Sequence, residues 1–140
     1  MIFFNRSTAY QNTRAFDRRF KLHPLVQNIL DNVLIYISLR FKAPVEGRIT
    51  STVSTLEEDV FLHRKSTTHL EGRAFDLSVK GLTDEQILEM KIAFTQVAGH
   101  LGALDSTTLL PKLIVDHDAG TGRHLHFQIA KNVAQNFKDA

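Results

Sequence analysis

Cysteine is absent from this chain, and the numbers of basic and acidic residues are nearly equal. Without cysteine the chain can form neither a disulfide nor a thiolate metal site, so any bound metal would need histidine and carboxylate ligands. Long apolar runs are also absent. The longest apolar segment, LVQNILDNVLIYISLRF, is interrupted by Gln27, Asn28, Asp31 and Asn32. That segment is unsuited to a membrane span, and we expect no membrane partner.

The net charge is only +2, from 17 basic and 15 acidic residues. Basic residues nevertheless gather near the N-terminus, at Arg6, Arg14, Arg18, Arg19 and Lys21. Such a patch can contact an anionic polymer such as a cell wall or a nucleic acid, although a solvated surface is its commoner meaning. We expect no nucleic-acid partner.

The length of 140 residues predicts one domain, 1–140, with an irregular N-terminal arm over residues 1–22. Hydrophobic periodicity predicts a helix over 24–41 and a second helix that begins at Thr83 and ends at Gly99 or Gly102. Alternation predicts strands over 48–55, 73–79, 112–116 and 124–130, with a loop at 117–123 and a short helix or frayed tail after residue 130. Two long helices with about four strands predict a small α+β domain with an antiparallel sheet.

Both predicted helices carry signals at their N-terminal ends. Pro24 suits the first position of a helix, and Thr83 with Gln86 forms a capping box. The second helix is expected to bury one face, which includes Met90 and Val97.

The predicted strand at 73–79 carries a carboxylate in its middle. Because side chains alternate faces along a strand, its apolar side chains can enter the core while Asp76 faces the other way. Likewise, His124 and His126 share one face of the last strand, opposite to Phe127. The acid and the two histidines can therefore line the same cleft.

A third histidine precedes the acid by seven residues. The intervening turn allows the imidazole of His69 to fold back towards Asp76. With His126, these residues would offer two nitrogens and one oxygen, which suits catalytic zinc with an open fourth position. The structural alternatives are an exposed Asp76 paired with Arg73 or Lys80, and a His69 that is a loop histidine or caps a backbone carbonyl.

The stretch TTHLEGRAFD, residues 67–76, resembles the SxHxxGxAxD motif of zinc D-Ala-D-Ala carboxypeptidases and related phage peptidoglycan endopeptidases. These enzymes share the hedgehog/DD-peptidase fold. The stretch HLHFQI resembles their late strand, which carries the third zinc ligand. Together the matches span about residues 48–130. The resemblance implies a hedgehog/DD-peptidase-like domain that binds Zn²⁺ through His69, Asp76 and His126.

The chain departs from that family pattern at three positions. Thr67 replaces the leading Ser of the motif. Arg123 stands three residues before the last ligand, where many relatives carry a catalytic acid. Ser54 stands where many relatives carry a substrate-binding Arg. Arg64, Arg48 or Arg123 could take that binding role, and the sequence does not choose among them.

The general base must therefore come from elsewhere. His124 lies on the ligand face, and Asp116 ends a stretch, LIVD, that resembles the LIxE strand of some phage relatives. A base must reach the attacking water directly or through one further water. His117 and Asp118 are weaker candidates in the predicted loop. Two structural alternatives stay open, in which His124 only orients a ligand and Asp116 only begins a turn.

We predict from these residues a monomeric zinc metallopeptidase that hydrolyses peptide bonds of bacterial peptidoglycan, as an endopeptidase or a carboxypeptidase. The opening MIFF is too short for a secretory signal. The resemblance then implies a phage endolysin or virion-associated lytic enzyme, made in the host cytoplasm and acting on the cell wall after release or within the virion. Two alternatives stay open: a catalytically inactive zinc-containing binding module, and a metal-dependent nuclease suggested by DHD and HLH.

Overall fold

The computed structural model describes residues 14–43, 48–118 and 122–137. Predictions for Arg6, for the rest of residues 1–13 and for loop residues 119–121 lie outside these ranges. The helices are η2 (Arg18–Lys21), α2 (Pro24–Arg40), α3 (Leu56–Phe61), α4 (Asp84–Ala98), η3 (Gly99–Leu101) and α5 (Lys131–Asn136). The strands are β1 (Ile49–Ser51), β2 (Ala74–Ser78), β3 (Ala103–Leu104), β4 (Pro111–Lys112), β5 (Ile114–Asp118) and β6 (Arg123–Gln128).

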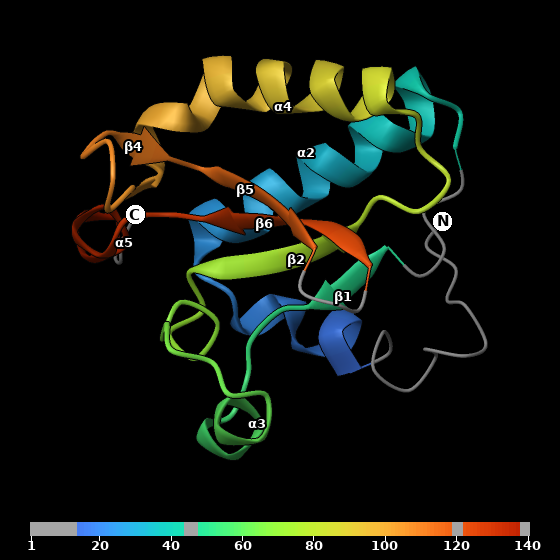
Figure 1. Cartoon of the computed structure of the whole chain (residues 1–140). Helices are drawn as coiled ribbons and strands as arrows, with labels where there is room; N and C mark the ends of the chain where they lie inside the picture. The colour runs from blue at the N-terminus through green and yellow to red at the C-terminus, as the bar shows by residue number, and fades with distance from the viewer. Residues whose placement is uncertain (1–13, 44–47, 119–121, 138–140) are drawn as a thin grey trace.

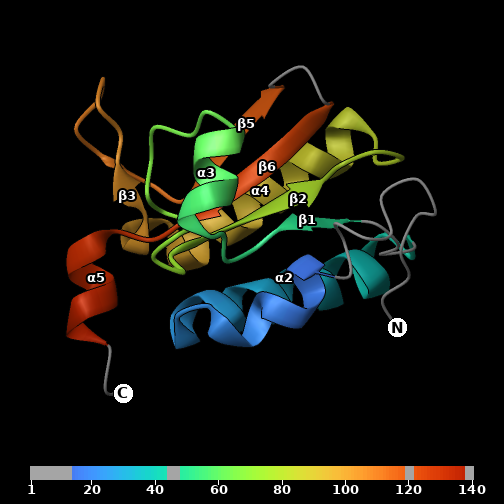
Figure 2. The same cartoon turned by 90° about the horizontal axis from the view of Figure 1, so that it is seen from below.

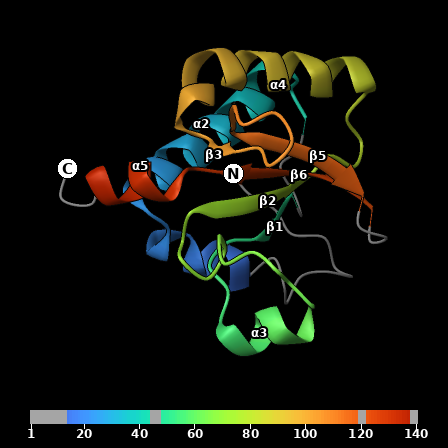
Figure 3. The ribbon, with the colours of Figure 1, turned by 60° about the vertical axis from the view of Figure 1, so that its left-hand side comes forward.

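Four strands form one antiparallel sheet in the order β1-β2-β6-β5, and β3 pairs with β4 in a separate hairpin. This architecture confirms the predicted α+β class with a small antiparallel sheet (Figure 1). Helix α4 runs beside the β5 edge, whereas α3 lies beyond the β1 edge (Figure 3). The long helices and α3 therefore flank the sheet from different sides.

One face of the sheet forms the hydrophobic core. The rings of Phe75 on β2 and Phe127 on β6 stack with centroids 4.7 Å apart. Phe94 of α4 meets Phe127 edge-on at 6.3 Å, and Val33 and Ile37 of α2 are fully buried in the same cluster. Figure 2 shows α2 on one side of the sheet and α3 on the other. Because the long helices cover only the apolar face, the opposite face is left for polar side chains.

The helix ends follow the predicted signals. Pro24 begins α2, and Thr83 with Gln86 forms the capping box of α4. Met90 is buried as predicted, but Val97 is 77% exposed, so that part of the prediction is wrong. The buried stripe of α4 ends at Ala98 instead.

In the part of the chain that the structure describes, no helix has both the length and the apolar character needed to cross a membrane.

Three boundaries differ from the sequence-based expectations. The predicted irregular arm is wrong for residues 14–21, which are helical and pack beside residue 52 through a hydrogen bond from Thr52 Oγ1 to the Ala15 carbonyl. Strand β1 is shorter than the predicted 48–55. Strand β5 extends to Asp118, so His117 and Asp118 are held in a sheet rather than in a loop. The hairpin of β3 and β4 was not predicted.

The stacked phenylalanines predict a large effect of core truncation. Phe127→Ala should lower the free energy of unfolding by about 3–5 kcal/mol, because it removes a fully buried ring and leaves a cavity. Urea unfolding followed by circular dichroism measures this loss. Phe61→Ala is the matched control, since Phe61 is 82% exposed and its truncation should change stability by about 0.5 kcal/mol or less. Equal losses in the two variants would contradict this account of the core.

Candidate metal centre

His69, Asp76 and His126 meet on the polar face of the sheet. Asp76 lies directly opposite His126 in the pairing of β2 with β6. One ligand atom from each residue lies within 4.8 Å of the other two. The Asp76 carboxylate is 2.8 Å from His126 Nδ1 and 3.2 Å from His69 Nε2. This buried group could hold a metal ion, with the three residues expected from the sequence.

A tight turn brings His69 to Asp76. The turn is closed by a hydrogen bond from the Gly72 N–H to the His69 carbonyl, and Gly72 has a φ of +71°. A side chain at Gly72 would be strained at this φ, and its Cβ would lie 3.1 Å from the Lys21 carbonyl oxygen. His69 Nδ1 donates to the Thr52 carbonyl at 2.8 Å. His69 Nε2 is thereby left to face Asp76.

Gln128 orients the second histidine, and it was not among the predicted site residues. His126 Nε2 donates to Gln128 Oε1 at 3.0 Å, which turns Nδ1 towards Asp76. Metal-bound histidines usually donate their other ring N–H to an oxygen in this way, which fixes the tautomer and the ring orientation. The sequence could have identified Gln128, because alternation along the strand HLHFQ places it on the same face as His126.

The Asp76 carboxylate is ionised despite its burial. Burial raises the pKa of Asp76, but its hydrogen-bonded partners His126 and His69 lower the pKa by more, so the net pKa falls well below its ordinary range. The ionised form is the one that binds metals. The alternative of an exposed Asp76 paired with Arg73 or Lys80 is wrong, because Asp76 is buried and Arg73 pairs with Glu71.

Arg64 lies beside the metal group. Its Nη1 donates to Asp59 Oδ1 at 3.1 Å and its Nη2 donates to Ser51 Oγ at 3.0 Å. The same Nη2 is 3.8 Å from Asp76 Oδ2. Asp59 is buried in α3, where it anchors the guanidinium. A fixed cation therefore stands next to the candidate ligands.

The other two arginines considered for substrate binding have different surroundings. Arg48 is buried and donates to the carbonyls of Ser78 and Lys80, so it supports the turn after β2. Arg123 donates to the carboxylates of Asp116 and Asp84. Among the three arginines, the structure therefore brings only Arg64 to the metal group.

Asp116 is not brought to the metal group. In the pairing of β5 with β6 it lies opposite Leu125, so its side chain takes the face of the sheet that the helices cover. Its carboxylate accepts hydrogen bonds from Arg123 Nε at 2.9 Å and from Lys91 Nζ at 3.1 Å. The Arg123 hydrogen bonds, with a smaller contribution from Lys91, lower the pKa of Asp116 to about 2.

His124 and His117 do lie on the metal face. They are partners in the pairing of β5 with β6, and their ring centroids are 4.1 Å apart. The ring of His117 is 6.4 Å from that of His126. The partial burial of its ring, followed by the neighbouring His124, lowers the pKa of His117. Asp118 pairs opposite Arg123 and takes the other face. The imidazoles are therefore the base candidates that the structure places near the group.

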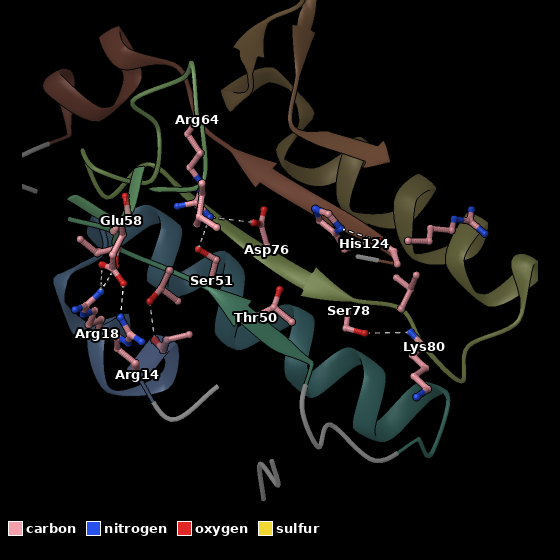
Figure 4. A pocket seen from close by; sticks show the side chains of 18 of the residues that line it. Arg14, Arg18, Thr50, Ser51, Glu58, Arg64, Asp76, Ser78, Lys80 and His124 are labelled. Carbon is pink, nitrogen blue, oxygen red and sulfur yellow. Dashed lines mark hydrogen bonds and ion pairs between the residues drawn. The ribbon is translucent and has the colours of Figure 1, made fainter. Parts of the chain in front are cut away.

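A groove of about 1040 Å³ runs past Asp76 (Figure 4). Arg14, Arg18 and Glu58 lie at one end, whereas Lys80 lies at the other, nearer to His124 (Figure 4). The Glu58 carboxylate accepts hydrogen bonds from both arginines. Although burial raises the pKa of Glu58, its hydrogen bonds lower it to about 2. The volume is sufficient for a small ligand or a peptide segment.

Comparison with models of known protein families, with curated protein sequences and with solved structures finds no match for this chain. The family resemblance of residues 67–76 therefore remains a prediction, and the geometry of the site carries the functional argument.

The Gln128 hydrogen bond predicts a measurable effect on metal affinity. Gln128→Leu should weaken zinc binding about 10–100-fold, because His126 loses the acceptor that fixes its tautomer. Competition with a chromophoric chelator measures this affinity. Gln128→Glu keeps an acceptor and should retain binding, and Gln135→Leu makes the same change on exposed α5 as a control. Unchanged affinity in Gln128→Leu would show that Gln128 does not orient the ligand.

The hydrogen bonds of Asp116 with Arg123 and Lys91 predict that this carboxylate stabilises the fold in a pH-dependent way. Its folded pKa of about 2 lies below the ordinary value near 3.9, so its stabilisation is present above about pH 4 and is lost as the pH falls towards 2. Asp116→Asn should therefore be about 1 kcal/mol less stable than wild type at pH 6, with a difference that shrinks towards pH 2. Urea unfolding at the two pH values measures this difference, and Asp31→Asn, at an exposed position of α2, is the control. A pH-independent difference would contradict this role.

Proposed function

We propose that this protein is a zinc metallopeptidase that hydrolyses peptide bonds of bacterial peptidoglycan. The observation that carries the proposal is the buried group of His69, Asp76 and His126, whose carboxylate lines a groove beside the fixed cation of Arg64. The resemblance of residues 67–76 to zinc carboxypeptidases and phage endopeptidases supports the same assignment.

The donor set fits zinc. Two imidazole nitrogens and one carboxylate oxygen are the ligands of many catalytic zinc sites, which keep a fourth position open. Each histidine also donates its other ring N–H to an oxygen, of Thr52 for His69 and of Gln128 for His126. Magnesium and calcium prefer sites built mainly from oxygen atoms, so they fit this group less well.

The side chains around the group can perform the remaining steps of amide hydrolysis. Zinc in such a site supplies an acidified water and polarises the substrate carbonyl. His124, on the face of His126, takes the proton of the attacking water and passes it to the leaving amine. Arg64, held by Asp59 and Ser51, stabilises the negative charge that develops on the carbonyl oxygen.

The charge of the groove supports an acidic peptide as substrate. Arg64 lies beside Asp76, and Lys80 lies at the end of the groove nearer to His124 (Figure 4). Peptidoglycan stem peptides carry free carboxylates that such cations can pair with. A phage endolysin or virion-associated lytic enzyme, made in the host cytoplasm and acting on the wall, is the biological setting that we propose.

One observation favours an inactive binding module as the second candidate. Asp116, the strongest carboxylate candidate for the base, pairs with Lys91 and Arg123 on the other face of the sheet. If His124 cannot serve as the base, the group would bind zinc without catalysis. Zinc in the protein without turnover of peptidoglycan would identify this case.

Purified cell walls test the proposal. Wild type should lower the turbidity of the walls and release muropeptides, and Asp76→Asn should lose both zinc and activity because a ligand is removed. His124→Ala should keep the zinc held by His69, Asp76 and His126 but slow hydrolysis about 100–10,000-fold. Asp116→Asn, on the other face of the sheet, is the matched control and should stay active at neutral pH. Full lysis by zinc-free Asp76→Asn protein would disprove the zinc mechanism, and full lysis by His124→Ala would disprove the assigned base.

A further inference from the structure

A second pair of histidines lies outside the group of three. His117 on β5 and His124 on β6 are directly opposite each other in the antiparallel pairing. Directly opposed residues have Cβ atoms about 4.5–5.5 Å apart, which lets two side chains reach one ligand between them. Their ring centroids are 4.1 Å apart, and the ring planes are tilted by 60°. The two imidazoles therefore lie in close contact with their planes tilted, and they do not stack flat against each other.

The tautomer of His124 is set by the backbone. His124 Nδ1 donates to the Gly122 carbonyl at 3.1 Å, so its Nε2 is left as a lone-pair donor. The Gly122 N–H in turn donates to Asp118 Oδ1 at 3.2 Å, which ties Gly122 to the end of β5. His69 has the same arrangement with Thr52. An imidazole that donates one ring N–H to an oxygen and keeps a lone pair on the other nitrogen is typical of metal ligands.

We propose that His117 and His124 form a second metal site, which binds a transition-metal ion such as Zn²⁺, Ni²⁺ or Cu²⁺. Paired neutral imidazoles select these ions over Mg²⁺ and Ca²⁺. The neighbouring acids on β5, Asp116 and Asp118, take the other face of the sheet and add no oxygen ligand. With two protein ligands instead of three, the second site binds more weakly than the group of His69, Asp76 and His126.

Occupation of this site has a chemical consequence. The metal would bind Nε2 of His124, the nitrogen that the proposed mechanism uses as the base. That consequence rests on the proposed function, whereas the existence of the site does not. The second metal and catalysis by His124 would therefore exclude each other.

Metal titration without substrate tests the site independently of hydrolysis. Isothermal titration of metal-free wild type with zinc chloride, and separately with nickel chloride, should show a tight equivalent followed by a weaker one. His117→Ala should lose only the weaker equivalent, and Asp76→Asn should retain the weaker one while losing the tight one. His100→Ala, which removes an exposed histidine from η3, is the matched control and should bind both.

Two results would overturn the proposal: a wild type that binds one equivalent of each metal, or a His117→Ala variant that still binds two. His117 is exposed, so its replacement should leave the metal-free melting temperature unchanged, which confirms that the variant is folded. Absence of peptidoglycan hydrolysis would count against the proposed function alone, since the titration contains no substrate.

Discussion

The antiparallel register that sets Asp76 opposite His126 is the constraint on which the candidate site depends. A slip of one residue in this pairing would turn one of the two ligands to the other face of the sheet, away from its partner. The core opposes that slip, because the same register stacks Phe75 on Phe127 at 4.7 Å with both rings buried. Packing on one face thus holds the metal ligands together on the other face, before any metal binds.

Alternation within strands made this part of the site predictable from sequence. An acid between Phe75 and Leu77, and a histidine between Leu125 and Phe127, must face away from the apolar side if these residues form strands. The α+β class followed from the same patterns and from the two helix starts. Bringing Asp76 and His126 together required only that the two strands pair, which their apolar faces favour, whereas His69 also required the tight turn at Gly72.

The position of Asp116 was not predictable in the same way. Its role depended on which face of β5 it takes, and that face depends on the register between β5 and β6. The register places Asp116 opposite Leu125 and His117 opposite His124, so the histidine faces the metal group and the acid faces the helices. A sequence with glycines between two strands leaves the length of the turn open, and a change of one residue exchanges the two faces.

The sequence also could not show that Arg64 lies beside the metal group, because the position of its side chain depends on contacts with separate elements. Its guanidinium is anchored by Asp59 of α3 and by Ser51 of β1, at 3.1 and 3.0 Å, whereas the Asp76 carboxylate is more distant, at 3.8 Å. A metal that engages Asp76 would therefore leave the main anchors of Arg64 in place. Because the buried Asp59 balances its charge, the guanidinium can stay beside a bound cation and remain directed at the groove. The Arg64 guanidinium is therefore already positioned to donate hydrogen bonds to a developing oxyanion, and it need not move when the metal binds.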